Sequence, residues 1–312
     1  MAAENFSEDK PQKPFGDLRC SPDLTPGLHG QLTLILVLNT AMSVTAFFGN
    51  ALILIALHKE SSLHPPSKLL FRSLATTDLG VGLISQPFAV IYWMSLVNED
   101  WNIRPYAFVA QFITSYILCG VSVATLTAIS VDRLLALLLG LRYRQVVTLK
   151  RTYVIVIAIW VVCTISSATQ FWNLLITLLC AIIGTSLCVV ISVFSYTKIF
   201  LTLRHHQNQV QTNVQQPNQT NQLNIARYKK AVSTAIWLQL TLAACYLPFV
   251  IVGVLMSYTG LSSSLCYPRI YARSLLFLNS SLNPILYCWK LEEVRQAVKD
   301  TIRQVLCHCF SS

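Results

Sequence analysis

The most constraining feature of this sequence is a stretch of 46 residues, Thr152 to Thr197, that contains no charged side chain. As one helix it would be roughly 70 Å long at about 1.5 Å per residue, which is more than twice the hydrocarbon thickness of a bilayer. The stretch must therefore fold back, and we expect the turn at Gln170, Trp172 and Asn173. It then supplies two membrane-spanning helices, Tyr153–Thr169 and Leu174–Leu203.

Five further segments are apolar and long enough to cross a bilayer as helices. The composition agrees with this interpretation, because only 12% of the residues are charged, about half the usual share in soluble domains. The sequence therefore predicts an all-α membrane protein, a seven-transmembrane helix bundle spanning residues 32–290. The other five spans are Leu32–Leu57, Leu69–Val97, Tyr106–Leu139, Ala231–Tyr258 and Ile270–Trp289.

The distribution of positive charge predicts the orientation. With seven spans, 17 of the 23 Lys and Arg residues fall on one side of the membrane, which is the cytoplasmic side by the positive-inside rule. The N-terminus is then extracellular, and residues 1–31 form a flexible tail with a glycosylation sequon at Asn5. We expect a multi-pass protein of the plasma membrane, in contact with membrane lipids. The net charge of +10 lies in short segments between spans and leaves no basic domain for nucleic acid.

Two segments lie outside the spans. Residues 205–224 are rich in Gln and Asn, which make up 12 of the 20 residues, and contain no charged residue besides two histidines; this predicts a disordered intracellular loop. Residues 291–312 begin with an amphipathic pattern that predicts a helix on the membrane surface. Cys307 and Cys309 follow it as candidate palmitoylation sites, with two unmodified cytosolic thiols as the alternative.

Polar side chains inside the spans mark a candidate switch. Asp78 is the only acid deep in a span, and left dry it would be neutralised. An oxygen cage around a sodium ion and a protonated, hydrogen-bonded carboxyl are both open alternatives. The intramembrane residues that could complete the site are Asn50, Ser122, Asn279, Ser280 and Asn283.

Two further features suggest moving parts. Pro248 and Pro284 interrupt the sixth and seventh spans and kink them, beside the polar residues Tyr246 and Tyr287. Asp132 and Arg133 stand where the third span leaves the hydrocarbon, since burial at its centre would cost about 2.5 to 3.5 kcal/mol each. An interfacial ion pair without further meaning is the simplest alternative.

These residues resemble the signature motifs of the rhodopsin-like (class A) G-protein-coupled receptors, one for each span and in the same order. The resemblance covers about residues 32 to 306. The matching motifs are Gly49-Asn50, Leu74-Ala75-Thr76-Thr77-Asp78-Leu79, Asp132-Arg133-Leu134, Trp160, Tyr196, Cys245-Tyr246-Leu247-Pro248 and Asn283-Pro284-Ile285-Leu286-Tyr287.

The resemblance implies a cell-surface receptor that converts binding of an extracellular ligand into outward movement of the sixth helix and activation of a heterotrimeric G protein, with a cyclic AMP readout. Arg133 would engage the G protein with support from Tyr196 and Tyr287, and Tyr246 would be the toggle beneath the ligand. The allosteric sodium ion would bind Asp78, Ser122, Asn279 and Asn283. No other cofactor is implied.

The sequence also departs from the family pattern. Phe108 stands where the outer cysteine of the third helix is usual, Cys188 replaces a proline of the fifth, and Tyr246 replaces a tryptophan. These traits are similar to the cluster of melanocortin, lysophospholipid, cannabinoid and adenosine receptors, and most to melanocortin receptors. By that resemblance, Cys20 and Cys266 would tie the tail to the third outer loop.

The expected ligand pocket is apolar with one cation, so a lipid or peptide with an anionic group would fit. Arg273 could instead snorkel to the headgroups. By analogy of position the pocket lining is Phe88, Tyr92, Gln111, Ser115, Tyr116, Cys119, Phe249, Arg273 and Phe277.

Other functions have less support. An enzyme is not expected, because no nucleophile and base pair or HExxH motif occurs in the spans. A transporter would commonly carry an internal repeat, and the two halves show none. A receptor-like protein that binds without signalling stays open, since the toggle residue is altered and the proline is missing.

Overall fold

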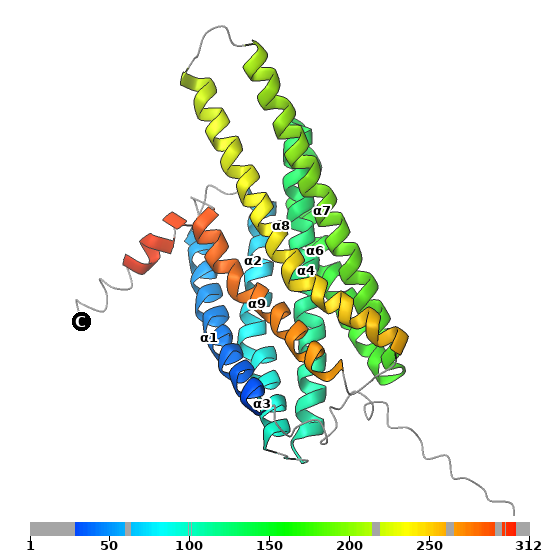
Figure 1. The fold of residues 1–312 in the computed structure, drawn as a ribbon. Coiled ribbons are helices and arrows are strands. Elements are labelled where there is room, and N and C mark those ends of the chain that lie inside the picture. The colour runs from blue at the N-terminus through cyan, green and yellow to red at the C-terminus, as the bar shows by residue number, and fades with distance from the viewer. Residues whose placement is uncertain are drawn as a thin grey trace, which may run out of the picture.

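The computed structural model describes residues 29–59, 64–98, 100, 102–213, 219–259, 265–290, 295–296 and 298–303, and all regular structure in these ranges is helical. Seven membrane-length helical segments run side by side as a bundle (Figure 1), which confirms the predicted fold. They are α1 (His29–Lys59), α2 (Pro65–Gly80) continued by α3 (Gln86–Val97), α4 (Arg104–Leu139), α6 (Leu149–Ala168), α7 (Leu174–Asn213), α8 (Gln219–Thr259) and α9 (Cys266–Lys290).

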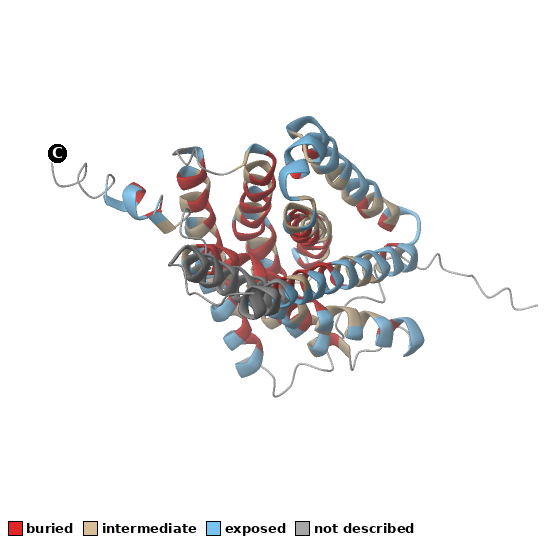
Figure 2. Ribbon diagram, turned by 90° about the horizontal axis from the view of Figure 1, so that it is seen from above, coloured by how far each residue is buried: buried red, intermediate tan, exposed pale blue. Residues whose placement is uncertain are grey.

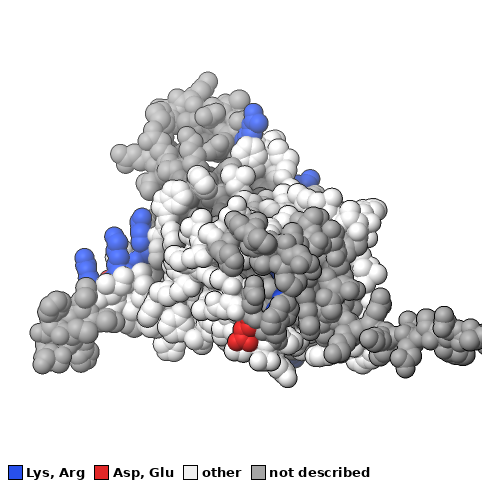
Figure 3. All heavy atoms as spheres, turned by 60° about the horizontal axis from the view of Figure 1, so that its bottom comes forward, with Lys and Arg blue, Asp and Glu red and all other residues white. Residues whose placement is uncertain are grey.

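The outer surface of the bundle is apolar. Phe48, Val154 and Ile183 expose 58% or more of their surface, and buried residues face the spaces between helices (Figure 2). Uncharged residues dominate the described surface in Figure 3, with Lys and Arg at its margins. Six of the described segments are long and apolar enough to cross a membrane; α9 is not among them, because it carries Arg269, Arg273 and several buried polar residues.

The second span contains a turn that the sequence did not predict. A five-residue π-helix, η2 (Val81–Ser85), separates α2 from α3, directly before Pro87, whose missing N–H cannot continue a regular α-helix. Gly82 in η2 presses against α1: a Cβ there would lie 2.8 Å from the Phe47 nitrogen. Ser43 Oγ donates to the Gly82 carbonyl at 2.6 Å. Glycine therefore allows this close approach.

The connection after α4 folds back onto the bundle. Gly140 has φ +50°, a conformation that favours glycine, and it ends α4 at Leu139. A 3₁₀ turn, η3 (Gly140–Arg142), and the short α5 (Tyr143–Val146) follow. This turn places Tyr143 beside α4.

The fold-back between the fourth and fifth spans is confirmed. α6 ends at Ala168, and a 3₁₀ turn, η4 (Thr169–Phe171), leads into α7 at Leu174. The Asn173 side chain accepts hydrogen bonds from the Leu175 and Ile176 nitrogens at 2.9 and 3.3 Å, so it caps α7 as an N-cap residue does.

The predicted disordered loop at residues 205–224 was wrong for its described part. α7 continues to Asn213 and α8 begins at Gln219, and both project beyond the other helices at the top of Figure 1. Glutamine is a good helix former, and no Gly or Pro occurs between Arg204 and Gln216. The polar composition therefore indicates that these parts of α7 and α8 lie outside the membrane, and it does not indicate that the helices end there.

Residues 295–296 and 298–303 are helical, with Val298 and Thr301 buried one turn apart. This agrees with the expected amphipathic helix. Cys307 and Cys309, like Asn5 and Cys20, lie outside the described residues, so their assigned roles stay predictions.

Candidate functional site

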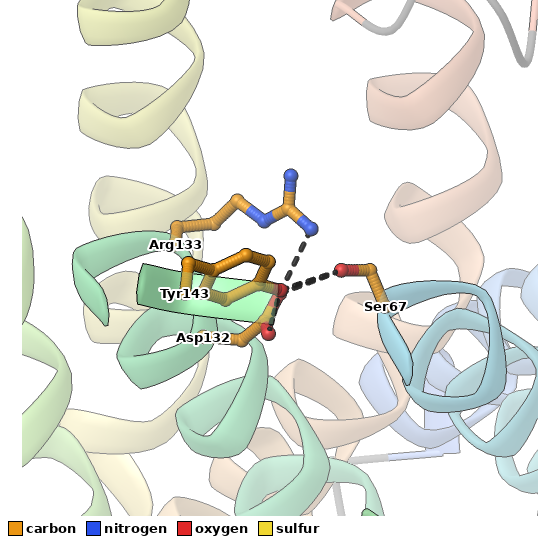
Figure 4. Close-up of polar contacts among 4 residues, drawn as sticks. All are labelled: Ser67, Asp132, Arg133 and Tyr143. Carbon is orange, nitrogen blue, oxygen red and sulfur yellow. Dashed lines mark hydrogen bonds and ion pairs between the residues drawn. The ribbon is translucent and has the colours of Figure 1, made fainter. Parts of the chain in front are cut away.

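Asp132 is held by three side chains from three different elements (Figure 4). Tyr143 of α5 donates to Asp132 Oδ1 at 2.6 Å, Ser67 of α2 donates to Oδ2 at 2.9 Å, and Arg133 Nη2 lies 2.8 Å from Oδ2. The Ser67 and Tyr143 hydroxyls are 3.2 Å apart. The carboxylate is thus saturated with charge-assisted hydrogen bonds, and we call this set the Asp132 network.

Arg133 is the exposed member of the Asp132 network. Its side chain is 42% exposed, against 4% for Asp132. The sequence contains no Asp or Glu between Arg133 and Leu291, so α8 and α9 offer no competing carboxylate. Ser67 and Tyr143 were not predicted, because their proximity depends on the turn at Gly140.

Two buried tyrosines lie in the same half of the bundle. Tyr196 of α7 packs in a small cluster with Leu134, Ile199 and Leu203. Tyr287 of α9 stacks edge-on against Phe71 with ring centroids 5.4 Å apart, and its hydroxyl has no hydrogen-bond partner among the described residues. A buried hydroxyl without a partner is costly, so a rearrangement that pairs it is favoured.

Asp78 is fully buried and accepts three hydrogen bonds from two helices. Ser122 of α4 and Ser280 of α9 donate to Oδ1 at 2.9 and 2.8 Å. Asn283 of α9 donates to Oδ2 at 2.7 Å. We call these four residues the Asp78 network; it links three spans at the middle of the bundle.

Ser280 and Asn279 have different places in this region. Ser280 belongs to the Asp78 network; the sequence named it among the residues that could complete the site, but the sodium site implied by the family resemblance omitted it. Asn279 is buried, but no contact with Asp78 is found among the described residues, and its Nδ2 atom has no partner there. Asn50 donates to the Ser280 carbonyl at 3.1 Å, which leaves the Asn50 Oδ1 atom buried and unpartnered in the described structure. A carboxylate, two hydroxyls and this free oxygen suit a small hard cation.

The two prolines stand within helices, as predicted. Pro284 of α9 meets Gly49 of α1, where a Cβ would approach it to 3.0 Å. Two residues before Pro248 in α8, the buried Tyr246 hydroxyl lies 3.5 Å from the Cys119 carbonyl. Pro248 therefore stands near a buried hydroxyl that can exchange partners, and Pro284 follows Asn283, which donates to Asp78.

A cavity of about 240 Å³ lies between α4, α6, α7, α8 and α9, and we call it the central cavity. Most of its lining is apolar. Tyr246 forms part of its wall, as expected of the residue beneath a ligand. Five of the nine predicted pocket residues line it: Ser115, Tyr116, Cys119, Phe249 and Arg273.

The other four predicted pocket residues lie away from the central cavity, so their role stays a prediction. Tyr92, Gln111 and Phe277 are buried in the packed interior, Phe88 is half-buried in α3, and none of the four lines the central cavity. The aromatic rings of Phe108 and Tyr92, 5.3 Å apart, fill the space on the α3 side. The central cavity lies instead beside α6 and α7. These two helices contribute small residues to its lining, which the analogy of position with the receptor family did not identify.

Arg273 is the one cationic side chain among the described residues that line the central cavity. Its guanidinium carbon lies 5.7 Å from the centroid of the Phe112 ring, a cation–π contact. No hydrogen bond or ion pair to Arg273 is found in the described structure. Nearby, the Ser115 hydroxyl is buried and unpartnered. One end of an otherwise apolar cavity thus carries a positive charge and a free hydroxyl.

Cys266 at the start of α9 is disulfide-bonded, as the predicted tie to the N-terminal tail requires of it. Its predicted partner, Cys20, lies outside the described residues, so the pairing itself stays a prediction. Six other described cysteines are free thiols: Cys119, Cys163, Cys180, Cys188, Cys245 and Cys288.

Comparison with known proteins matches the arrangement of motifs. The family described as 7 transmembrane receptor (rhodopsin family) matches residues 49–172 and 162–287. Melanocortin receptor 4 of Danio rerio is 26% identical over 297 residues, covering 91% of this chain and 87% of that protein. G-protein coupled receptor 12 of Homo sapiens is 27% identical, covering 84% and 78%. Adenosine receptor A2b of Bos taurus is 32% identical over 47% of this chain and 43% of its own length.

Proposed function

The chain belongs to the rhodopsin family of seven-transmembrane receptors, and we propose that it works as a switch in which release of Arg133 from Asp132 opens the bundle to a G protein. The protein is a cell-surface G-protein-coupled receptor rather than an enzyme. Our proposal concerns which residues perform the switching. The observation that carries it is the Asp132 network.

The Asp132 network favours one position of Arg133. Tyr143 and Ser67 fix the carboxylate in place, and the carboxylate holds the guanidinium. Arg133 is partly exposed and α8 offers no acid, so its release breaks one hydrogen bond to a charged group, which contributes about 1.5 to 3 kcal/mol. A released Arg133 would present its donors to a partner between the projecting ends of α7 and α8.

The buried tyrosines would support the released state. Tyr287 has an unpaired hydroxyl, and Tyr196 lies beside Leu134, the residue after Arg133. Bending at Pro248 would move the end of α8 that precedes it, while Tyr246 on the cavity wall would sense the ligand. A ligand shifts this equilibrium only by its difference in affinity for the two states.

We also propose a sodium ion as an allosteric ligand of the Asp78 network. Asp78, Ser122 and Ser280 supply oxygens, and Asn50, which donates to the Ser280 carbonyl, has an unpartnered Oδ1 in the described structure. Such an ion would compete with the hydrogen bonds that join α4 and α9 to Asp78. Asp78→Asn is expected to remove any dependence of the unfolding temperature on sodium against potassium; an unchanged dependence would contradict this site.

The orientation and the ligand class are proposals as well. With the positive-inside rule, the projecting ends of α7 and α8 lie in the cytoplasm and the N-terminus outside. Arg273 and Ser115 favour a ligand with an anionic group. The similarity to melanocortin and adenosine receptors supports cyclic AMP as the readout to measure.

The test is nucleotide exchange on a purified heterotrimeric G protein, with the receptor in lipid nanodiscs. We expect Arg133→Ala to reduce receptor-dependent exchange at least tenfold. Arg151→Ala is the matched control, because Arg151 is also an exposed arginine near this end of the bundle and donates to the Val146 carbonyl. Equal exchange by wild type and Arg133→Ala would contradict the proposal, and ligand binding without any exchange would indicate a non-signalling receptor.

A further inference from the structure

Aromatic, aliphatic and guanidinium side chains border the central cavity toward the end of the bundle opposite the Asp132 network. A second, smaller cavity of about 30 Å³ lies beyond it, next to Phe108, Met256 and Arg269 near the helix ends. The two cavities share four lining residues, so these side chains separate them: Phe112, Leu178, Phe249 and Arg273. Three apolar side chains and a guanidinium therefore stand between the central cavity and the outer face.

The side of the central cavity between α6 and α7 is built differently. Val162 of α6 lines the cavity and is 61% exposed, and Gly184 of α7 is exposed as well. A Cβ added at Gly184 would meet nothing within 4 Å. In a membrane protein these exposed faces contact lipid, so the cavity continues into the bilayer at this point.

Small side chains form this opening at helical spacing. On α7 they form two adjacent pairs four residues apart, and on α6 and α4 they stand one turn apart. Val162 on α6 is a larger aliphatic beside them. The small residues that line the cavity here are Cys180, Ala181, Gly184 and Thr185 on α7, Cys163 and Ser166 on α6, and Gly120 and Ala124 on α4.

The shape and polarity of the cavity define an occupant. From Phe112 to Ala124 it extends roughly 18 Å along α4, at about 1.5 Å per residue, within only about 240 Å³. It is therefore a narrow slot. Its charged end holds Arg273 and the unpartnered Ser115 hydroxyl, and its apolar remainder leads toward lipid.

We propose that a single-chain lipid with a carboxylate headgroup enters the central cavity from the bilayer through the opening between α6 and α7. The carboxylate would pair with Arg273 and accept from Ser115, and the chain would lie along α4 with its end in the opening. This inference rests on the proposed receptor function, since the same lipid would contact Tyr246. The separating layer of Phe112, Leu178 and Phe249 favours this route over entry from water.

The test measures binding of tritiated oleate to the receptor in nanodiscs of neutral phosphatidylcholine, without G protein. Binding can therefore fail while receptor-dependent exchange persists, or the reverse. We expect saturable binding that excess unlabelled oleate displaces. Gly184→Trp and Val162→Trp, which fill the opening from its two sides, should each weaken binding at least tenfold, and Arg273→Gln should do the same.

The matched controls introduce the same tryptophan side chain at positions next to the opening. Ile183→Trp and Val161→Trp alter residues that are 58% and 49% exposed and do not line the central cavity; they should bind oleate as wild type does. Unfolding temperatures verify that each variant is folded. If a tryptophan variant does not fold, Gly184→Leu is used in its place. Wild-type binding by both opening variants would overturn the route. If oleyl alcohol displaced tritiated oleate as well as unlabelled oleate does, or if lysophosphatidate displaced it more strongly, the proposed carboxylate headgroup would be contradicted.

Discussion

The two carboxylates that are buried in the described part of this receptor are held by different kinds of partner. Asp78 is fully buried and accepts only from neutral groups, two hydroxyls and an amide. Asp132 also accepts two hydroxyl hydrogen bonds but is paired with the guanidinium of Arg133. One carboxylate joins spans at the middle of the bundle, and the other restrains an exposed cation at its end.

This difference separates structural from switching roles. Removing Asp78 would leave three donors of α4 and α9 without an acceptor in a dry interior, where each lost partner is costly. Releasing Arg133 from Asp132 exposes a cation that is already partly in water and leaves the carboxylate its Tyr143 and Ser67 hydrogen bonds, so it costs one charge-assisted hydrogen bond, about 1.5 to 3 kcal/mol. We therefore expect changes at Asp78 to act mainly on stability and changes at Asp132 mainly on activity.

Asp78→Ala should have the largest effect on stability. Three unpaired buried donors at about 1 kcal/mol or more each give a loss of about 3 kcal/mol or more. The unfolding temperature, followed with a thiol-reactive dye that reports exposure of the buried cysteines, should fall further than in any other variant proposed here. Wild-type stability in Asp78→Ala would show that the three hydrogen bonds do not matter.

Asp132→Asn should have the largest effect on basal activity. It retains the size of the side chain but removes the charge that holds Arg133, at a cost in stability of about 1 to 2 kcal/mol. Ligand-independent nucleotide exchange should rise several-fold. A variant that loses stability as Asp78→Ala does, with no rise in exchange, would erase the contrast between the two carboxylates.

Tyr143→Phe should reproduce part of the Asp132→Asn effect. It deletes the hydroxyl that lies 2.6 Å from Asp132 Oδ1, and a hydrogen bond to a charged group contributes about 1.5 to 3 kcal/mol. Asp132 becomes less restrained but keeps its charge, so basal exchange should rise by less than in Asp132→Asn. The exposed Tyr153→Phe is the matched control and should leave exchange unchanged.

Ser280→Ala should have the smallest effect and should distinguish Ser280 from Asn279. Ser280 donates to Asp78, so its loss should lower stability by about 1 kcal/mol. Sodium dependence of the unfolding temperature should weaken with it. If Asn279→Ala removed the sodium dependence and Ser280→Ala left it intact, the site predicted from the sequence would be correct and the one inferred from the geometry wrong.

The sequence predicted the spans because charge-free length is a strong constraint in a membrane protein. The 46-residue stretch required a turn, and Asn173 with its neighbours was the place for it. The projecting ends of α7 and α8 were not predicted, because the polar composition of a segment indicates that it is exposed to solvent and does not indicate its helix propensity. The π-helix before Pro87 was equally hidden, and it changes the rotation of α3, where Phe88 and Tyr92 were assigned to the pocket.

The Asp78 site shows the same limit at the level of single residues. Adjacent helix positions differ by about 100° around the axis. Whether Ser280 or Asn279 faces Asp78 therefore depends on the rotation of α9 near Pro284, which no sequence pattern reports. Tyr143 was missed for a related reason, since the turn at Gly140 brings it to Asp132, and Ser67 was missed because its approach depends on how α2 packs against α4.

The most direct test of the switch is the basal nucleotide exchange of Asp132→Asn with and without Arg133→Ala. If Asp132 acts by restraining Arg133, the several-fold gain of Asp132→Asn must disappear in the double variant, whose exchange falls to that of Arg133→Ala alone. A double variant that retains the full gain would contradict the account, because Asp132 would then act through some other group.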